Sequence, residues 1–97
     1  MRIIAHRKIA EFYEDHPNAK IPLEEWYLKT KKSEWGNFAD VKNTFNSVDY
    51  AGNQRYIFNI KGNEYRLVAM ILFQIKRVYI RFIGTHEEYD KIDCSKI

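Results

Sequence analysis

The first half of the chain places apolar side chains at the spacing of a helix. The positions that share one face follow i, i+4, i+7, i+8 and i+11 spacing: Ala5, Ile9, Phe12, Tyr13 and His16. Pro17 follows at once, and proline disfavours helical backbone in the residue before it. The pattern therefore predicts a helix that ends at Pro17 and Asn18.

Two further helices are expected before residue 46. Pro22 suits a first helical turn, and the acidic Glu24 and Glu25 favour the positive end of the helix dipole. The apolar stripe of this second helix is Leu23, Trp26, Tyr27 and Thr30, and its last turn carries Lys29, Lys31 and Lys32. A third, short helix is predicted after Asn37, which is a good N-cap with Asp40 three residues on.

The second half of the chain favours strands. Apolar and polar residues alternate over 56–60, and Lys61, Gly62 and Asn63 supply turn chemistry. The segment 65–73 is nearly all apolar, as expected of a central strand, and 77–83 follows after a break at 74–76. Ile3 and Ile4 predict an added edge strand. The pattern indicates an α+β fold, with N-terminal helices packed on one face of an antiparallel sheet.

Length and composition limit the classes of protein to consider. The 97 residues suffice for one domain, so residues 1–97 are predicted to form a single unit. The net charge of +3 and pI of about 9.0 mildly favour a polyanionic partner. Cys94 is the sole cysteine, residues 1–6 lack a signal-peptide pattern, and no apolar run approaches membrane-spanning length. We therefore expect a soluble, cytoplasmic protein without a membrane partner.

Two strand arginines are the first candidates for chemistry. Arg66 lies near the start of the most apolar strand and Arg81 near the end of the next one. Arginine keeps its charge, so placing it beside such a strand is costly unless an anion lies opposite. One interpretation is structural, with Glu64 pairing with Arg66 and Tyr79 sharing a face with Arg81. The other is a two-arginine clamp for a phosphate.

The segment after the last strand adds titratable groups. His86 is expected on a loop or new helical turn, with Tyr89 three residues on and Lys91 close by. Histidine is the usual acid or base near neutral pH, and tyrosine offers a ring for stacking on bases. Together with the arginines, these groups are what metal-free RNA cleavage requires. The structural alternative is that His86 caps the strand and Tyr89 fills the edge of the core.

No metal or cofactor is expected. The three histidines and Cys94 lack the spacing of metal ligands. Glu87, Glu88 and Asp90 have the chemistry to bind a hard cation, but a solvated acidic turn is the simpler interpretation. The chain has no glycine-rich phosphate loop and no nucleophile motif.

At this point the sequence resembles a known family. Four blocks carry the resemblance, and they look like the signature of HigB toxins: residues 26–27, 35–42, 58–67 (FNIKGNEYRL) and 79–92, which contains GTHEEYDKI. The resemblance implies a RelE-like fold and mRNA cleavage on the ribosome without metal, with the 2′-hydroxyl as nucleophile. It also implies a HigA-type helix-turn-helix antitoxin, through which alone the toxin reaches operator DNA.

The resemblance extends to single residues. Arg66 matches the central-strand arginine of RelE-like toxins, His86 matches a position just past the last strand that is catalytic in several of them, and Tyr89 matches the aromatic that follows. Arg81 is a weaker match, because its counterpart varies. The catalytic set implied is therefore His86, Arg66, Arg81 and Tyr89. Apart from the resemblance, the lysines expected to contact RNA are Lys31, Lys32, Lys61 and Lys91. For Lys31 and Lys32 the alternative is a solvated helix end, where cations suit the helix dipole.

Two other classes stay open at the level of sequence. A RelE-fold toxin that is no nuclease, such as a ParE-like gyrase inhibitor, would need no histidine acid or base, so His86 beside Arg66 argues against it. A plain RNA-binding module would use the same basic and aromatic residues without turnover.

Overall fold

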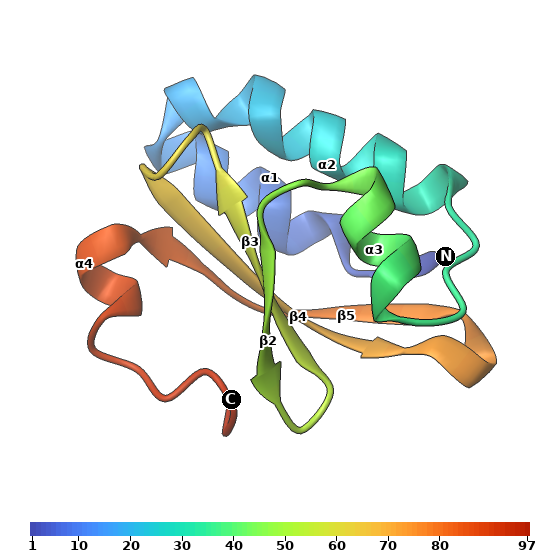
Figure 1. The fold of residues 1–97 in the computed structure, drawn as a ribbon. Coiled ribbons are helices and arrows are strands. Elements are labelled where there is room, and N and C mark those ends of the chain that lie inside the picture. Colours follow the sequence, from blue (N-terminus) through green and yellow to red (C-terminus); the bar gives the residue numbers. More distant parts are fainter.

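Three helices lie on one face of a five-stranded sheet, as Figure 1 shows. The computed structural model describes all residues, 1–97. In chain order the elements are β1 (Arg2–Ile4), α1 (His6–Asp15), the 3₁₀ turn η1 (Pro17–Ala19), α2 (Lys20–Lys32), α3 (Phe38–Thr44), β2 (Val48–Gly52), β3 (Arg55–Ile60), β4 (Tyr65–Leu72), the 3₁₀ turn η2 (Phe73–Ile75), β5 (Arg77–Thr85) and α4 (His86–Tyr89).

The helices follow the predicted pattern with one shift. α1 ends before Pro17, and α3 is capped by Asn37, whose Oδ1 accepts a hydrogen bond of 3.0 Å from the backbone N–H of Asp40. α2 begins at Lys20, not at Pro22 as predicted. The first four N–H groups of a helix have no partner within it, so a proline in the third position removes no helical hydrogen bond.

The sheet has the order β1-β5-β4-β3-β2, which makes β4 the central strand, as predicted. β2 to β5 form the antiparallel meander, and β1 adds to its edge parallel to β5. The predicted break near residue 75 is the turn η2, which ends at Lys76 in the left-handed region. The other edge strand, β2, was not predicted, because its residues Val48–Gly52 carry no clear alternation.

The core lies between the sheet and α1 to α3. Alternate residues of β3 and β4 point into it, among them Phe58 and Leu67, which are almost fully buried. Trp26 of α2 packs edge-on against Phe58, with ring centroids 5.3 Å apart. The intervening residues of the same strands, including Arg66, therefore belong to the opposite face.

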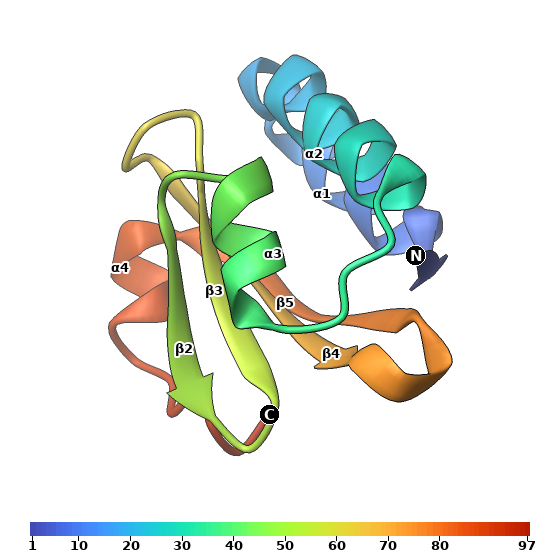
Figure 2. The same cartoon turned by 45° about the vertical axis from the view of Figure 1, so that its right-hand side comes forward.

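That opposite face carries α4 and the residues after it. Figures 1 and 2 agree that α4 lies across the sheet from α1 and α2. The final residues return along this face toward the β2–β3 turn. Asn53 donates a hydrogen bond of 3.0 Å to the carbonyl of Ser95, and Arg55 donates one of 2.7 Å to Ile97.

Candidate active site

Arg66 lies at the centre of the candidate site. It pairs with Gly84 of β5 on one side and with Asn59 of β3 on the other, and it is half-buried. Its guanidinium Nη1 donates hydrogen bonds to the carbonyls of Asn63, at 3.1 Å, and Tyr65, at 3.4 Å. It thus binds backbone only and keeps its charge available for an anion.

The expected pairing of Glu64 with Arg66 is wrong. Glu64 lies in the turn before β4, so the alternation of strand side chains does not apply to it. Its Oε1 accepts from Lys61 Nζ at 3.2 Å, and its Oε2 accepts from Asn18 at 3.1 Å. No ion pair involves Arg66 or Arg81.

Tyr89 packs beside Arg66. The guanidinium carbon lies 5.7 Å from the centre of the Tyr89 ring, within range of a cation–π contact. Burial, followed by the hydrogen-bonding contact with Cys94 Sγ at 3.7 Å, raises the pKa of Tyr89 to about 12, although Arg66 opposes the shift. The phenol is therefore neutral at physiological pH and offers a ring or a neutral hydrogen bond, not a proton acceptor.

His86 opens α4 at a fixed place in the fold. Its backbone N–H donates to the carbonyl of Glu64 at 3.2 Å, and the preceding Thr85 forms a capping box with Glu88. The backbone N–H of Thr85 binds Glu88 Oε1 at 2.8 Å, and this bond is the main cause that holds the pKa of Glu88 below its ordinary value. The helical turn predicted as one option for His86 is confirmed.

Asp90 is a neighbour of His86 that the sequence interpretation did not single out. Its Oδ2 lies 3.0 Å from His86 Nδ1, and both side chains are exposed. A carboxylate at Nδ1 favours the tautomer with its proton there, which leaves Nε2 without a hydrogen-bond partner in the protein. The i, i+4 spacing within a helical turn was the available signal.

A hollow of about 480 Å³ lies beside His86, which makes it comparable in size to small-molecule sites. It is lined by His16, Asn63, Glu64, Tyr65, Thr85, His86 and Glu87. Arg66 is not among these residues, but its guanidinium binds the carbonyls of two of them, Asn63 and Tyr65. His86, the guanidinium of Arg66 and a space for a ligand thus lie near the same end of β4.

Arg81 does not join this group. It is the extra residue of a β-bulge between Ile80 and Phe82, it is exposed, and it faces no partner in β4. Gly84, which pairs with Arg66, lies three residues further along β5, roughly 10 Å away at strand spacing. The bulge breaks the alternation of side chains along β5. The expectation that Tyr79 and Arg81 share a face assumed a regular strand and therefore does not hold.

The four lysines fall into two groups. Lys61, in the β3–β4 turn, and Lys91, just after α4, flank the candidate site. Lys31 and Lys32 lie at the far end of α2, where the amino group of Met1 donates to the carbonyl of Lys31 at 3.3 Å. Met1 leads into β1, which pairs with the start of β5, whereas His86 follows the end of that nine-residue strand.

The chain matches a known protein family over most of its length. The family described as HigB toxin, the RelE-like toxic component of a toxin–antitoxin system, matches residues 19–92. The chain belongs to the HigB toxin family. The matched range contains the four catalytic residues expected from the sequence, and the observed α+β fold is consistent with RelE-like toxins. A toxin of such a system has an antitoxin as its partner.

Curated relatives point the same way. The chain is 33% identical over 92 residues to the mRNA interferase toxin HigB of Escherichia coli K12, covering 93% of this chain and 88% of that protein. An mRNA interferase HigB of Escherichia coli O6:H1 is 29% identical over 94 residues, covering 95% and 91%. As for membranes, none of the helices has both the length and the apolar character needed to cross one.

Proposed function

We propose that this toxin inhibits translation by cutting mRNA on the ribosome, with the hollow beside His86 as its active site. The chain is an endoribonuclease, as its relatives named mRNA interferases indicate. The single observation that carries the proposal for the site is the meeting of His86, Arg66 and Tyr89 around one end of β4. Arg66 lacks a carboxylate partner there, so a phosphate would complete its surroundings.

The proposed reaction uses the 2′-hydroxyl of the RNA as nucleophile. As the bond from the 2′-oxygen to phosphorus forms, the bond from phosphorus to the 5′-oxygen breaks. His86 gives a proton to the leaving 5′-oxygen, and Asp90 orients the His86 ring through its Nδ1. Arg66 stabilises the negative charge that builds on the phosphorane. The proton of the 2′-hydroxyl passes to a separate base as that oxygen bonds to phosphorus. The scheme uses side chains of the chain and no metal.

The other basic residues act on RNA outside the reacting phosphate. Tyr89 positions a base near Arg66 by stacking or edge contact. Lys61 and Lys91 contact neighbouring phosphates, and Arg81 reaches a phosphate further along the strand because of its distance from Arg66. Lys31 and Lys32, at the far end of α2, contact ribosomal RNA.

The antitoxin of the proposed pair is a HigA-type helix-turn-helix protein. A toxin with an exposed phosphate clamp arrests its own host unless a partner covers or distorts the site. Operator DNA is then bound by the antitoxin, with the toxin attached to it. Co-expression with the neighbouring open reading frame is expected to restore growth.

Mapping the 5′ ends of mRNA after a short pulse of expression tests the function. A ribosome-dependent nuclease gives new 5′ ends inside translated regions within minutes, and these ends vanish when ribosomes are blocked from initiating. A ParE-like gyrase inhibitor gives DNA damage with intact mRNA. A non-catalytic RNA-binding module gives stalled translation without new ends, and either of these two results overturns the proposal.

A further inference from the structure

We propose that His16 is a second catalytic residue, the general base that takes the proton from the 2′-hydroxyl. This inference rests on the proposed function, since it assigns a group to the step that His86 leaves open. His16 ends α1, seventy residues before His86, yet both rings line the same hollow. Cleavage through a 2′-hydroxyl needs one group to accept a proton and another to donate one.

Contacts with α1 hold the His16 ring in one orientation. The ring is stacked on Phe12, with centroids 4.2 Å apart and planes within 6° of parallel. Nδ1 lies 3.2 Å from the carbonyl oxygen of Phe12. A carbonyl oxygen only accepts, so Nδ1 carries the hydrogen and Nε2 carries the lone pair. The neutral ring is thereby set as a base at Nε2, which has no hydrogen-bond partner in the protein.

Tyr65, at the start of β4, connects the positions of the two histidines. The Tyr65 ring meets His16 edge-on, with centroids 5.6 Å apart, and Tyr65 pairs with Thr85, the residue before His86. The Tyr65 hydroxyl donates to Asn18 Oδ1 at 2.5 Å, which ties β4 to the end of α1. His16 and Tyr65 are therefore both held in place by packing and hydrogen bonds, as a preorganised site requires.

The step balances with these two groups. Nε2 of His16 takes the proton of the 2′-hydroxyl as that oxygen bonds to phosphorus. The bond from phosphorus to the 5′-oxygen breaks, and protonated His86 gives its Nε2 proton to that oxygen. The products are a 2′,3′-cyclic phosphate and a 5′-hydroxyl, and the enzyme ends with His16 protonated and His86 neutral. Exchange of one proton with water restores the starting state.

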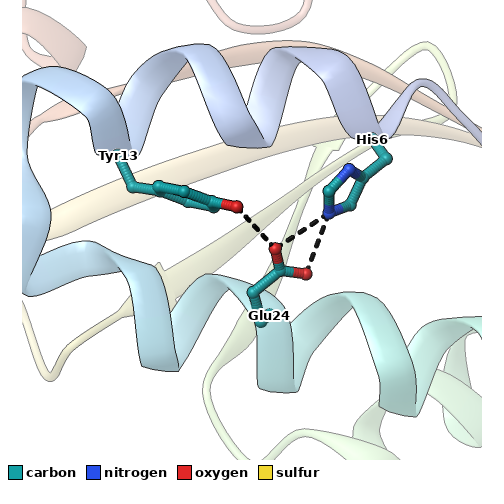
Figure 3. A network of polar contacts seen from close by, with 3 residues as sticks. All are labelled: His6, Tyr13 and Glu24. Carbon is teal, nitrogen blue, oxygen red and sulfur yellow. Dashed lines mark hydrogen bonds and ion pairs between the residues drawn. The ribbon is translucent and has the colours of Figure 1, made fainter.

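Other candidates for the base are occupied or differently placed. Figure 3 shows His6, on the same helix, with its Nε2 between both oxygens of Glu24 at 2.9 Å, and Glu24 also accepting from Tyr13. Glu64, which lines the hollow, is bound by Lys61 and Asn18. Glu87 also lines the hollow, and it is the one competitor that the experiment must separate.

Several carboxylates lie around the hollow. His16 is faced by Glu88 of α4, by Glu64 before β4 and by Glu87, whereas His86 has Asp90 at its Nδ1. Carboxylates repel an anion, so the positive charge that holds the substrate phosphate must come from a neighbouring cation, and Arg66 is the one assigned to it.

The test is the pH dependence of single-turnover cleavage on programmed ribosomes, for wild type, His16→Asn, His6→Asn, Glu87→Gln and His86→Ala. A base must be deprotonated and an acid protonated, so the wild-type rate should rise and then fall with pH. His16→Asn should lose about 10²-fold or more at neutral pH and lose the rising acidic limb. In a further variant, His16→Ala, added imidazole should restore part of the rate. His86→Ala should lose the falling limb.

His6→Asn is the matched control, a histidine of the same helix outside the hollow, and it should keep the wild-type profile. Thermal unfolding and antitoxin binding of His16→Asn show whether the variant is folded. Wild-type protein that cuts nothing would refute the proposed function itself. Wild-type cleavage together with an unchanged rate and acidic limb in His16→Asn overturns the present inference alone, as does loss of that limb in Glu87→Gln.

Discussion

The guanidinium of Arg66 lies over the ring of Tyr89, 5.7 Å from its centre, and joins the central strand to the short helix that follows the sheet. This contact connects the fixed positive charge of β4 to the segment that carries His86. The ring covers one side of the guanidinium, so an anion must approach Arg66 from another side. In the proposed mechanism, strand and helix therefore act on the RNA as one unit.

Replacing Arg66 tests its role in stabilising charge. Arg66→Ala should lower single-turnover cleavage by about 10²–10³-fold, because it removes a donor to the phosphorane. Arg66→Lys should recover only part of the loss, since lysine lacks the planar fork. Arg81→Ala is the matched control on the neighbouring strand and should cost less than Arg66→Ala. Equal losses of cleavage rate in Arg66→Ala and Arg81→Ala would contradict the conclusion that Arg81 lies apart from the candidate site.

Substitutions of Tyr89 separate its ring from its hydroxyl. The pKa of about 12 keeps the phenol neutral through the working range of pH, so its hydroxyl does not act as a base toward RNA. Tyr89→Phe should retain most of the cleavage rate, whereas Tyr89→Ala should lose stacking worth about 1–3 kcal/mol, measured as kcat/KM on programmed ribosomes. If Tyr89→Phe is as damaging as Tyr89→Ala, the hydroxyl and not the ring is the working part.

The polar network between α1 and α2 predicts a stability that depends on pH. Partial burial opposes ionisation of Glu24, but the hydrogen bonds from His6 and Tyr13 outweigh it and hold the pKa of this carboxyl below its ordinary value. A carboxyl with a lowered pKa stabilises the fold above its unfolded pKa, and this contribution is lost as the pH falls through the folded value.

Glu24→Gln should therefore lower the free energy of unfolding by about 1 kcal/mol at pH 7, measured by urea denaturation. The difference from wild type should shrink as the pH falls below the unfolded value of about 4.3 and through the lower value of the folded protein. Glu25→Gln, at the exposed neighbouring position, is the control and should be nearly silent. A difference that stays constant from pH 7 to pH 3 would show that the network does not act through the charge of Glu24.

The lysines at the end of α2 are predicted to act on ribosome affinity alone. Lys31→Ala together with Lys32→Ala should weaken ribosome binding and lower the slope of log K against log salt by about one for each phosphate that a lysine had neutralised. Single-turnover cleavage at saturating ribosomes should be unchanged, because both residues lie at the opposite end of β5 from His86. Lys42→Ala, on α3, is the control. An unaltered affinity and slope would leave the two lysines as a solvated helix end.

Much of the fold could be predicted because its patterns are local. The apolar run of 65–72 belongs to the central strand, and Asn37 caps its helix, as their side-chain chemistry requires. The edge strand β2 lacks alternation and was missed, and no pattern revealed the bulge at Arg81, which depends on the register between two strands. The partner of Glu64 was mispredicted because a turn residue does not follow strand alternation.

The candidate site, like the fold, could be predicted only in part. Arg66, His86 and Tyr89 could be proposed together, since antiparallel pairing brings the start of one strand beside the end of the next. From the sequence, Asp90 could be described only as part of an acidic turn. The structure places its Oδ2 3.0 Å from His86 Nδ1, because α4 brings the two side chains together. His16 was visible only as a helix-face residue, because its nearness to His86 depends on how α1 packs on the sheet.

Proton transfer by His86, in mRNA cleavage that needs no metal, is the step on which the proposed mechanism depends. Single-turnover cleavage on programmed ribosomes, with a chelator present, tests it most directly. Wild type is expected to cut at its full rate, and His86→Ala is expected to lose about 10²–10⁴-fold while still binding ribosomes and antitoxin. A His86→Ala variant that cuts at the wild-type rate, or cleavage that appears only when metal is added back, would contradict this mechanism.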